Sequence, residues 1–212
     1  MTNKKAQLPQ LNSALTVTTI QAFQPDETYQ DLLLTDLTVE STELNYNYFR
    51  GVHFKHVQFN QVDFRNCDFQ DVWFENCGLL NCTLIGNSFG RVHFENCQLV
   101  GSNFAEAGFR DVTVTGCQAD YTSFDQSRMR HADFTDNRLH ESSWRAVDWQ
   151  WLTLMNNDLN GIDFNQTKLA QIDLSDNQFE QATFSIPLLK GATISPEQSL
   201  VIMAALKINV NS

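Results

Sequence analysis

The sequence predicts an all-β fold: a four-sided parallel β-helix of about eight 20-residue coils, followed by a C-terminal helix and a short strand. Two observations lead to this prediction. Every fifth residue from Leu34 to Ile194 is apolar, and 15 of the 16 Phe residues belong to this series, Phe23 being the exception. Positions 20 apart also repeat in type, as in Val52, Val72, Val92 and Val112.

A spacing of five suits neither of the common regular elements. Residues five apart on an α-helix lie about 140° apart around the axis, so the apolar series would cover every face. On a straight strand, an odd spacing moves the side chain to the opposite surface. The series can share one core only if the chain turns a corner every five residues, and four such turns complete one coil.

A second ordered series lies two residues before each member of the first, and it holds small or β-branched residues and all five Cys residues. Alternation along a short extended segment points both series inward. We therefore expect buried thiols in a reducing compartment, with an oxidised pair among Cys77, Cys97 and Cys117 as the alternative. The same column continues with amides that can hydrogen-bond along the axis, at Asn137, Asn157 and Asn177.

Three segments are expected along the chain: an N-terminal tail or cap (1–28), the β-helix (29–194) and a C-terminal segment (195–212). Residues 1–28 are polar and out of phase. We expect their first part to be mobile and the stretch near Phe23 to cover the open edge of the first coil. A loop of about five or ten residues could fit in the weak stretch 116–129.

The C-terminal segment has the sequence of a helix start. Ser195 suits the N-cap, Pro196 the first helical position, and Gln198 completes a capping box. We expect the helix to continue over 200–207, with a short strand after it. Its apolar face exceeds what an end cap needs, which favours a homodimer through this end over a monomeric cap. The predicted interface residues are Leu200, Met203, Leu206, Ile208 and Val210.

The composition argues for a single domain and against several classes of function. The formal net charge of −11 argues against nucleic acid or an anionic membrane as the main partner. No secretory signal is visible, and the apolar run 200–206 is too short to span a bilayer, so we expect a cytoplasmic protein. No catalytic motif occurs, and the stacked His53, Trp73 and His93 lack further ligands. We expect no enzyme activity, no cofactor and no metal site.

A strict 20-residue coil sorts the outward pairs that follow each core residue onto four faces. Two adjacent faces are then acidic, the third is mixed, and the fourth leans basic through Arg50, Arg91, Arg110, Arg130 and Lys190. These acids could be ordinary solvated charges, or they could bind a cationic partner. The candidate partner-binding residues are Asp36, Glu40, Glu75, Glu95, Asp120, Asp136, Glu141, Asp176 and Glu180, and the strongest lie near the C-terminal end, namely Asp136, Glu141, Asp176 and Glu180.

The repeat resembles the pentapeptide repeat family, whose loose consensus is A-(D/N)-L-x-x. Matching triplets include Cys67-Asp68-Phe69 and Ala132-Asp133-Phe134, and the resemblance covers about three quarters of the chain. It implies a right-handed quadrilateral parallel β-helix. The stretches 117–124 and 195–208 are most similar to the Qnr-type, quinolone-resistance subgroup.

That subgroup implies a dimer joined through its C-terminal end, which binds DNA gyrase and topoisomerase IV at their DNA-binding surface. The projecting loops that many Qnr-type proteins carry are not visible in this sequence. The leading hypothesis is therefore a DNA mimic that protects these enzymes from quinolones. The alternative is a structural or interaction scaffold with an unrelated protein partner.

Overall fold

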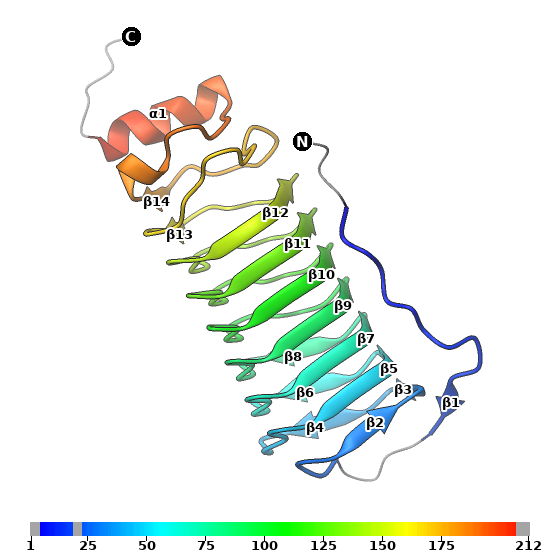
Figure 1. Ribbon diagram of the computed structural model, residues 1–212. Helices are drawn as coiled ribbons and strands as arrows, with labels where there is room; N and C mark the ends of the chain where they lie inside the picture. The colour runs from blue at the N-terminus through cyan, green and yellow to red at the C-terminus, as the bar shows by residue number, and fades with distance from the viewer. Residues whose placement is uncertain (1–4, 19–22, 207–212) are drawn as a thin grey trace.

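The chain forms a parallel β-solenoid of about eight coils that ends in one helix (Figure 1). The structure is a computed structural model and describes residues 5–18 and 23–206. Successive strands pair in parallel with an offset of 20 residues, so that Phe54 lies beside Phe74 and Phe74 beside Phe94. The register continues unchanged from Gly108↔Arg128 onward, so the stretch 116–129 holds no inserted loop. The predicted fold class is confirmed.

The long strands, of eight residues each, stack side by side into one continuous sheet along the molecule. It contains β5 (Tyr48–Lys55), β7 (Asp68–Glu75), β9 (Ser88–Glu95), β10 (Gly108–Thr115), β11 (Arg128–Thr135) and β12 (Asp148–Met155). At its N-terminal end the same sheet includes β1 (Thr16–Val17), β2 (Thr28–Gln30) and β3 (Leu32–Thr35). Separate small sheets are formed by β4 (Thr38–Glu40), β6 (Gln58–Asn60) and β8 (Gly78–Leu80), and by β13 (Ile162–Phe164) and β14 (Ala182–Phe184).

Each coil has four walls, which we number in chain order. Wall 1 consists of the second halves of the long strands, such as 92–95. Wall 2 contains β4, β6 and β8 and continues as single bridges from Gly78 to Gln178. Wall 3 runs through the bridges from Glu43 to Asp163 and on to β13 and β14, and wall 4 consists of the first halves of the long strands, such as 88–90. Wall 2 therefore lies opposite wall 4.

The corners between walls depend on one backbone conformation. From Asp36 to Gln171, the residue two positions after each core residue has a left-handed backbone, with φ near +55° at positions such as Asn76, Asn96 and Asp136. A β-branched side chain is strained in this region, whereas Asn, Asp and Gly tolerate it. Val, Ile and Thr are accordingly absent from all positive-φ positions among the described residues. The five-residue rhythm is thus set by corner residues as well as by core residues.

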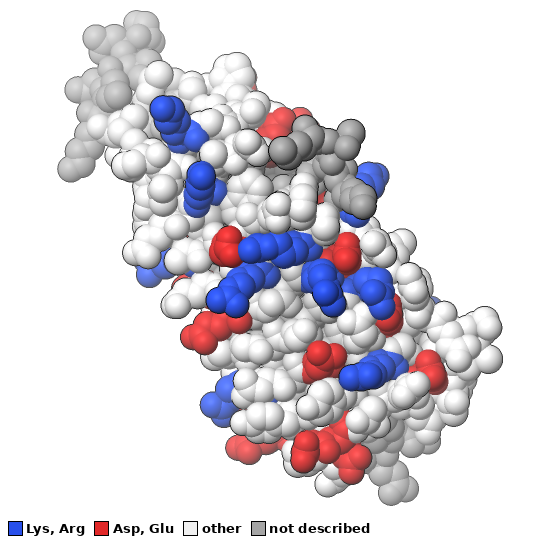
Figure 2. Space-filling view, viewed as in Figure 1, with Lys and Arg blue, Asp and Glu red and all other residues white. Residues whose placement is uncertain are grey.

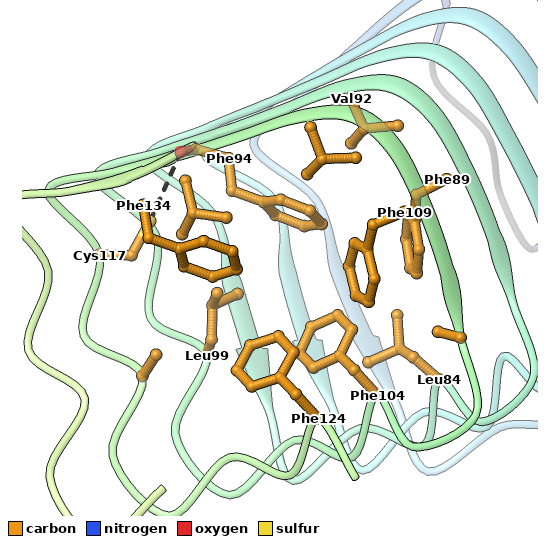
Figure 3. Close-up of a cluster of buried hydrophobic side chains, with 14 of the residues drawn as sticks. Leu84, Phe89, Val92, Phe94, Leu99, Phe104, Phe109, Cys117, Phe124 and Phe134 are labelled. Atoms are coloured by element: carbon orange, nitrogen blue, oxygen red, sulfur yellow. Dashed lines mark hydrogen bonds between the residues drawn. The ribbon is translucent and has the colours of Figure 1, made fainter. Parts of the chain in front are cut away.

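The apolar series fills the lumen as stacked rings. Phe89 lies on Phe109 with ring centroids 5.0 Å apart, and Phe104 lies on Phe124 at 5.2 Å. Rings on opposite walls also meet edge to face, as Phe94 on wall 1 and Phe104 on wall 3 do at 6.2 Å (Figure 3). Each buried Phe contributes about 1.5–3 kcal/mol of hydrophobic stabilisation. The core is therefore continuous along the whole solenoid.

The polar members of the second inward series donate to carbonyl oxygens of the neighbouring coil. The Cys117 thiol donates to the Phe94 carbonyl oxygen at 3.5 Å (Figure 3), and the Asn157 amide donates to the Phe134 carbonyl at 3.0 Å. The Asn157 Oδ1 also accepts from the Asn137 backbone N–H at 3.0 Å, so the amides form the expected ladder. All five Cys residues are buried and unlinked. Burial raises the pKa of Cys67 to about 12, so this thiol stays protonated at neutral pH.

The regular series of left-handed corners stops after Gln171, because Asp176 and Gln181 already lack a positive φ. Ile186 occupies a corner position, but a β-branched residue is disfavoured there, and the chain instead forms the short 3-10 helix η1 (Ile186–Leu188). The helix α1 (Pro196–Ala205) then covers the last coil, with Ser195 as N-cap in a capping box with Gln198. The Gln198 amide also donates to the carbonyl oxygens of Leu174 and Asn177, at 2.8 and 2.6 Å, and so joins α1 to the end of the Asn ladder.

The N-terminal segment differs most from the expectation. Residues 5–18, which we call the strap, were expected to be mobile but lie extended along the corner between walls 4 and 1 (Figure 1). The Gln10 and Gln7 backbone N–H groups donate to the carboxylates of Asp71 and Asp111, at 2.9 and 3.3 Å. After the strap, Phe23 is buried against Phe49 and Phe59 at the open end of the first coil.

Candidate partner-binding surfaces

The structure distributes the nine candidate acids over two walls and two corners. Glu75 and Glu95 lie on wall 1, and Asp36, Asp136 and Asp176 lie at the corner between walls 1 and 2. Glu40, Asp120 and Glu180 belong to wall 2, and Glu141 lies at the corner between walls 2 and 3. They do not form one patch, because the coils that carry them are spread along the molecule.

Four of the nine form a compact group that we call the acidic frame. Asp136 and Glu141 mark the two edges of wall 2 in one coil, and Asp176 and Glu180 mark them two coils further on, about 9.6 Å along the axis. All four side chains are exposed, and none has an ion pair within the part of the chain that the structure describes. Each is therefore free to meet a cation on another molecule.

Three of the remaining acids have a basic side chain or a histidine beside them, and one of the three, Glu75, is paired with a lysine. Glu75 accepts hydrogen bonds from Lys55 and His53, each at 2.9 Å. The hydrogen bond from Lys55 is the main cause of the lowered pKa of Glu75, and burial opposes it. Asp36 lies 3.5 Å from the His56 ring, and both are exposed. Glu95 is half-buried and lies 3.7 Å from His93. These contacts leave the N-terminal half of the acidic surface less available to a partner.

The expectation that Asp120 faces a partner is wrong. Asp120 is buried and forms a two-pronged ion pair with Arg138, whose Nε lies 2.9 Å from Oδ1. Arg138 comes from the next coil, and its backbone carbonyl accepts from the Ala119 N–H at 2.7 Å. The sequence-based sorting counted only the two residues that follow each core residue. The residue just before the core residue also points outward, and Arg138 occupies such a position on wall 2.

Because the sorting did not count the residue before each core residue, it also missed other outward charged side chains. Arg128 and Lys168 on wall 4, Asp133 on wall 1 and Asp158 on wall 2 all lie between two inward residues. Alternation along each short strand would have placed them outward. Asp158 lies 2.6 Å from His140, so wall 2 also carries one acid–histidine pair between the corners of the acidic frame.

Wall 4 has the opposite charge character. Figure 2 shows Lys and Arg side chains gathered over β9 to β11. Arg91 is paired with Asp71 at 2.6 Å, and Arg130 is paired with Asp148 at 2.7 Å. Arg110 and Arg128 have no ion pair among the described residues. Opposite sides of the solenoid therefore carry opposite charge, with unpaired acids at the edges of wall 2 and unpaired arginines on wall 4.

The His53–Trp73–His93 column lies on wall 1 beside the strap. The His53 and Trp73 rings are parallel and 4.5 Å apart, and His93 lies 5.9 Å further on. Burial lowers the pKa of both histidines, so they are neutral at pH 7. No group of three His, Cys, Asp or Glu residues within reach of one metal ion occurs in residues 5–18 or 23–206.

The C-terminal helix exposes an apolar face. Gln198 and Ile202 point toward the last coil, whereas Leu200, Met203 and Leu206 on the opposite side are 55%, 37% and 42% exposed. The two other predicted interface residues, Ile208 and Val210, and the short strand expected around them lie outside the described residues. None of the described helices is both long and apolar enough to cross a bilayer.

Comparisons with known proteins agree with this architecture. The family model for the pentapeptide repeat region matches residues 87–164, and that for the luminal domain of SV2A/B/C matches residues 30–109. Among solved structures, HetL, a pentapeptide repeat protein involved in heterocyst differentiation regulation in the cyanobacterium Nostoc, is similar over 81% of this chain and 86% of its own. Its sequence identity is 12% and its TM-score 0.52. The chain is thus similar to the pentapeptide repeat region over part of its length, and to HetL in its fold.

A second solved structure is QnrB1, a plasmid-mediated fluoroquinolone resistance protein. It has 18% identity and a TM-score of 0.48, with 98% of each chain covered. No curated protein matches the chain. At 12% identity the likeness to HetL concerns the fold alone, and function has to be argued from the surfaces of this solenoid.

Proposed function

We propose that this pentapeptide solenoid is a DNA-mimicking protein that binds the cationic DNA-binding surface of DNA gyrase or topoisomerase IV and thereby protects the enzyme from quinolones. The observation that carries the proposal is the acidic frame. Its four carboxylates are exposed and unpaired, and a rigid β-solenoid holds them at fixed spacing. A cationic groove can neutralise such carboxylates without first breaking internal ion pairs.

The charge density of the molecule supports the comparison with DNA. A net charge of −11 over a rod of about 40 Å is roughly one charge per 3.6 Å. Duplex DNA carries one per about 1.7 Å. The solenoid thus has about half the linear density of DNA, enough to compete for a basic groove at moderate salt. Wall 4 carries the opposite sign, so the protein would enter such a groove with wall 2 first.

The C-terminal helix supports a longer mimic. Leu200, Met203 and Leu206 form an exposed apolar strip at the end of the rod nearest the acidic frame. A two-fold contact through this strip would join two rods end to end and bring two acidic frames close to the centre of the dimer. The sequence similarity of 195–208 to Qnr-type proteins favours the same arrangement.

The proposal is tested by gyrase supercoiling with and without ciprofloxacin. We expect micromolar protein to restore supercoiling in the presence of the drug, or to inhibit supercoiling by competition with DNA. Raising the salt concentration should weaken either effect, because the contact is electrostatic. If neither rescue nor inhibition occurs at low salt, the solenoid is instead a scaffold with another protein partner.

A further inference from the structure

The strap occupies a surface with a regular spacing of acceptors. Asp31, Asp71 and Asp111 lie 40 residues apart at the corner between walls 4 and 1, and each has a left-handed backbone. Because one coil contains 20 residues, these aspartates repeat every two coils, or about 9.6 Å along the axis. Asp133 on wall 1 adds a fourth carboxylate, which accepts from the Ala6 backbone N–H at 3.0 Å.

This spacing fits one backbone conformation of the ligand. Gln10 donates to Asp71 and Gln7 to Asp111, so the strap advances three residues for every two coils. A polyproline II helix has three residues per turn and rises about 3.1 Å per residue, or about 9.3 Å per turn. Every third N–H then points to the same side, as the two contacts require. The ring of Pro9 fixes its own φ near the polyproline II value, and it also favours an extended or polyproline II backbone at Leu8, the residue before it.

An aromatic column lies beside the row of aspartates. Trp73 follows Asp71 by two residues and stacks on His53, and both rings belong to wall 1. His53 and His93 point outward, yet their side chains are only 13% and 14% exposed. The Trp73 Nε1–H is buried and has no acceptor among the described residues. A ligand that placed a carbonyl oxygen here would satisfy a donor that the strap leaves unpaired.

The charges of the surface and of the strap are complementary. The chain has 25 acidic residues, but none precedes Asp26, whereas Lys4 and Lys5 both lie in this N-terminal part. The strap is also held by few contacts: its backbone bonds to the aspartates, the pairing of β1 with β3, and half-buried side chains such as Pro9 and Leu11. Leu8 is 61% exposed. Such an occupant can be displaced by a ligand of the same conformation.

We propose that the corner between walls 4 and 1, formed by Asp71, Asp111, Asp133 and the His53–Trp73–His93 column, is a docking track for a polyproline II segment. The ligand is a non-acidic, proline-containing segment of a partner protein, and the strap occupies the track in cis until that segment displaces it. Aromatic rings beside hydrogen-bonding groups are a recurrent way of recognising this conformation. The inference does not depend on the proposed binding of topoisomerases.

The test uses a dye-labelled peptide with the sequence of residues 2–11 and a chain that lacks those residues. We expect the shortened chain to bind the peptide saturably in fluorescence anisotropy, and the full chain to bind it at least tenfold more weakly, because the cis strap competes at high effective concentration. Asp71→Asn in the shortened chain should weaken binding about tenfold by removing a charged acceptor. The exposed Asp176→Asn is the matched control and should leave binding unchanged.

Several results would overturn the docking track. These are no saturable binding by a folded shortened chain at millimolar peptide, equal binding by the Asp71→Asn variant, or equal binding by the full chain. A dimer of the full chain that the truncation converts to monomer would assign the track to the strap of a second copy instead. If the shortened chain does not fold, hydrogen exchange of the Gln7 and Gln10 amides in the full chain provides the test. Both should be protected, and Asp71→Asn with Asp111→Asn should remove that protection; unprotected amides in the unmodified chain would contradict the proposal.

Discussion

At the scale of the residue, the molecule depends on two inward side chains and one corner in every five positions. A large apolar residue fills the lumen, and the residue two positions earlier is small or, where it is Cys or Asn, donates to a carbonyl oxygen of the neighbouring coil. The Cys97 thiol and the Asn157 amide do this in equivalent ways, donating to Phe74 and Phe134 at 3.3 and 3.0 Å. The column can therefore change from thiol to amide without a change of backbone.

Removal of one central ring should have a large effect. Phe104→Ala should lower the free energy of unfolding by about 3–5 kcal/mol, because Phe104 is buried and stacks on Phe124 at 5.2 Å. Phe104→Leu should cost less, since Leu84 occupies the same column one coil earlier. Chemical denaturation measures both. A loss below about 1 kcal/mol for the Ala variant would contradict a continuous, close-packed core.

At the scale of the element, the corners decide where the solenoid continues and where it stops. From Asp36 to Gln171 the left-handed corners hold many residue types, Tyr121, Ala146 and Trp151 among them, but no Val, Ile or Thr. At Ile186 the chain leaves the regular coil and forms η1, and α1 then covers the end. The corner positions thus restrict the sequence of the regular coils, as the core series does.

A branched residue at a mid-solenoid corner should therefore be destabilising. Gln126 has φ +57° and an exposed side chain. Gln126→Val should lower the free energy of unfolding by about 1–2 kcal/mol through backbone strain alone. Gln126→Asn should change it by less than about 0.5 kcal/mol. Equal unfolding free energies for the Val and Asn variants would show that the corner conformation does not limit the sequence.

The attachment of the strap should depend on pH. Burial alone would raise the pKa of Asp71, but hydrogen bonds from Arg91, the Gln10 amide and Gln70 outweigh it and lower the pKa below its ordinary value of 3.8. A lowered pKa stabilises the folded state above pH 3.8, and this contribution is lost as the pH falls through the lower, folded-state pKa. Exchange of the Gln10 amide should accelerate in that acidic window beyond its intrinsic trend. In Asp71→Asn the acceleration should be absent; the same acceleration in both chains would exclude Asp71 as its cause.

The fold could be predicted from the sequence because the apolar residues recur with a fixed period. The path of the strap could not be predicted, because no periodic pattern marks its contacts. The apolar series and Ser195-Pro196-Glu197-Gln198 are local patterns with a direct structural meaning. The strap is held by backbone groups of residues such as Ala6 that bond to Asp133, 127 residues away. The pairing of Asp120 with Arg138 was accessible in principle, but only by counting every outward position on the wall.

At the scale of the whole molecule, the solenoid is a rod with chemically different sides. Wall 2 is edged by the acidic frame, wall 4 carries Arg110 and Arg128, and the corner between walls 4 and 1 holds the strap. A rod with this distribution presents a defined side to a charged partner rather than a uniform negative field. In the proposed dimer, the exposed apolar strip on α1 would be the end of the rod at which two copies meet.

The most direct test of this account is displacement of a fluorescent DNA duplex from purified gyrase by matched charge-reversal variants. Glu141→Lys changes the acidic frame, and Glu106→Lys changes an equivalent exposed, left-handed corner that lies between walls 3 and 4. We expect the unmodified protein and Glu106→Lys to displace DNA alike, and Glu141→Lys to need a several-fold higher concentration. Equal displacement by both variants, or none by the unmodified protein, would contradict the assignment of wall 2 as the DNA-mimicking surface.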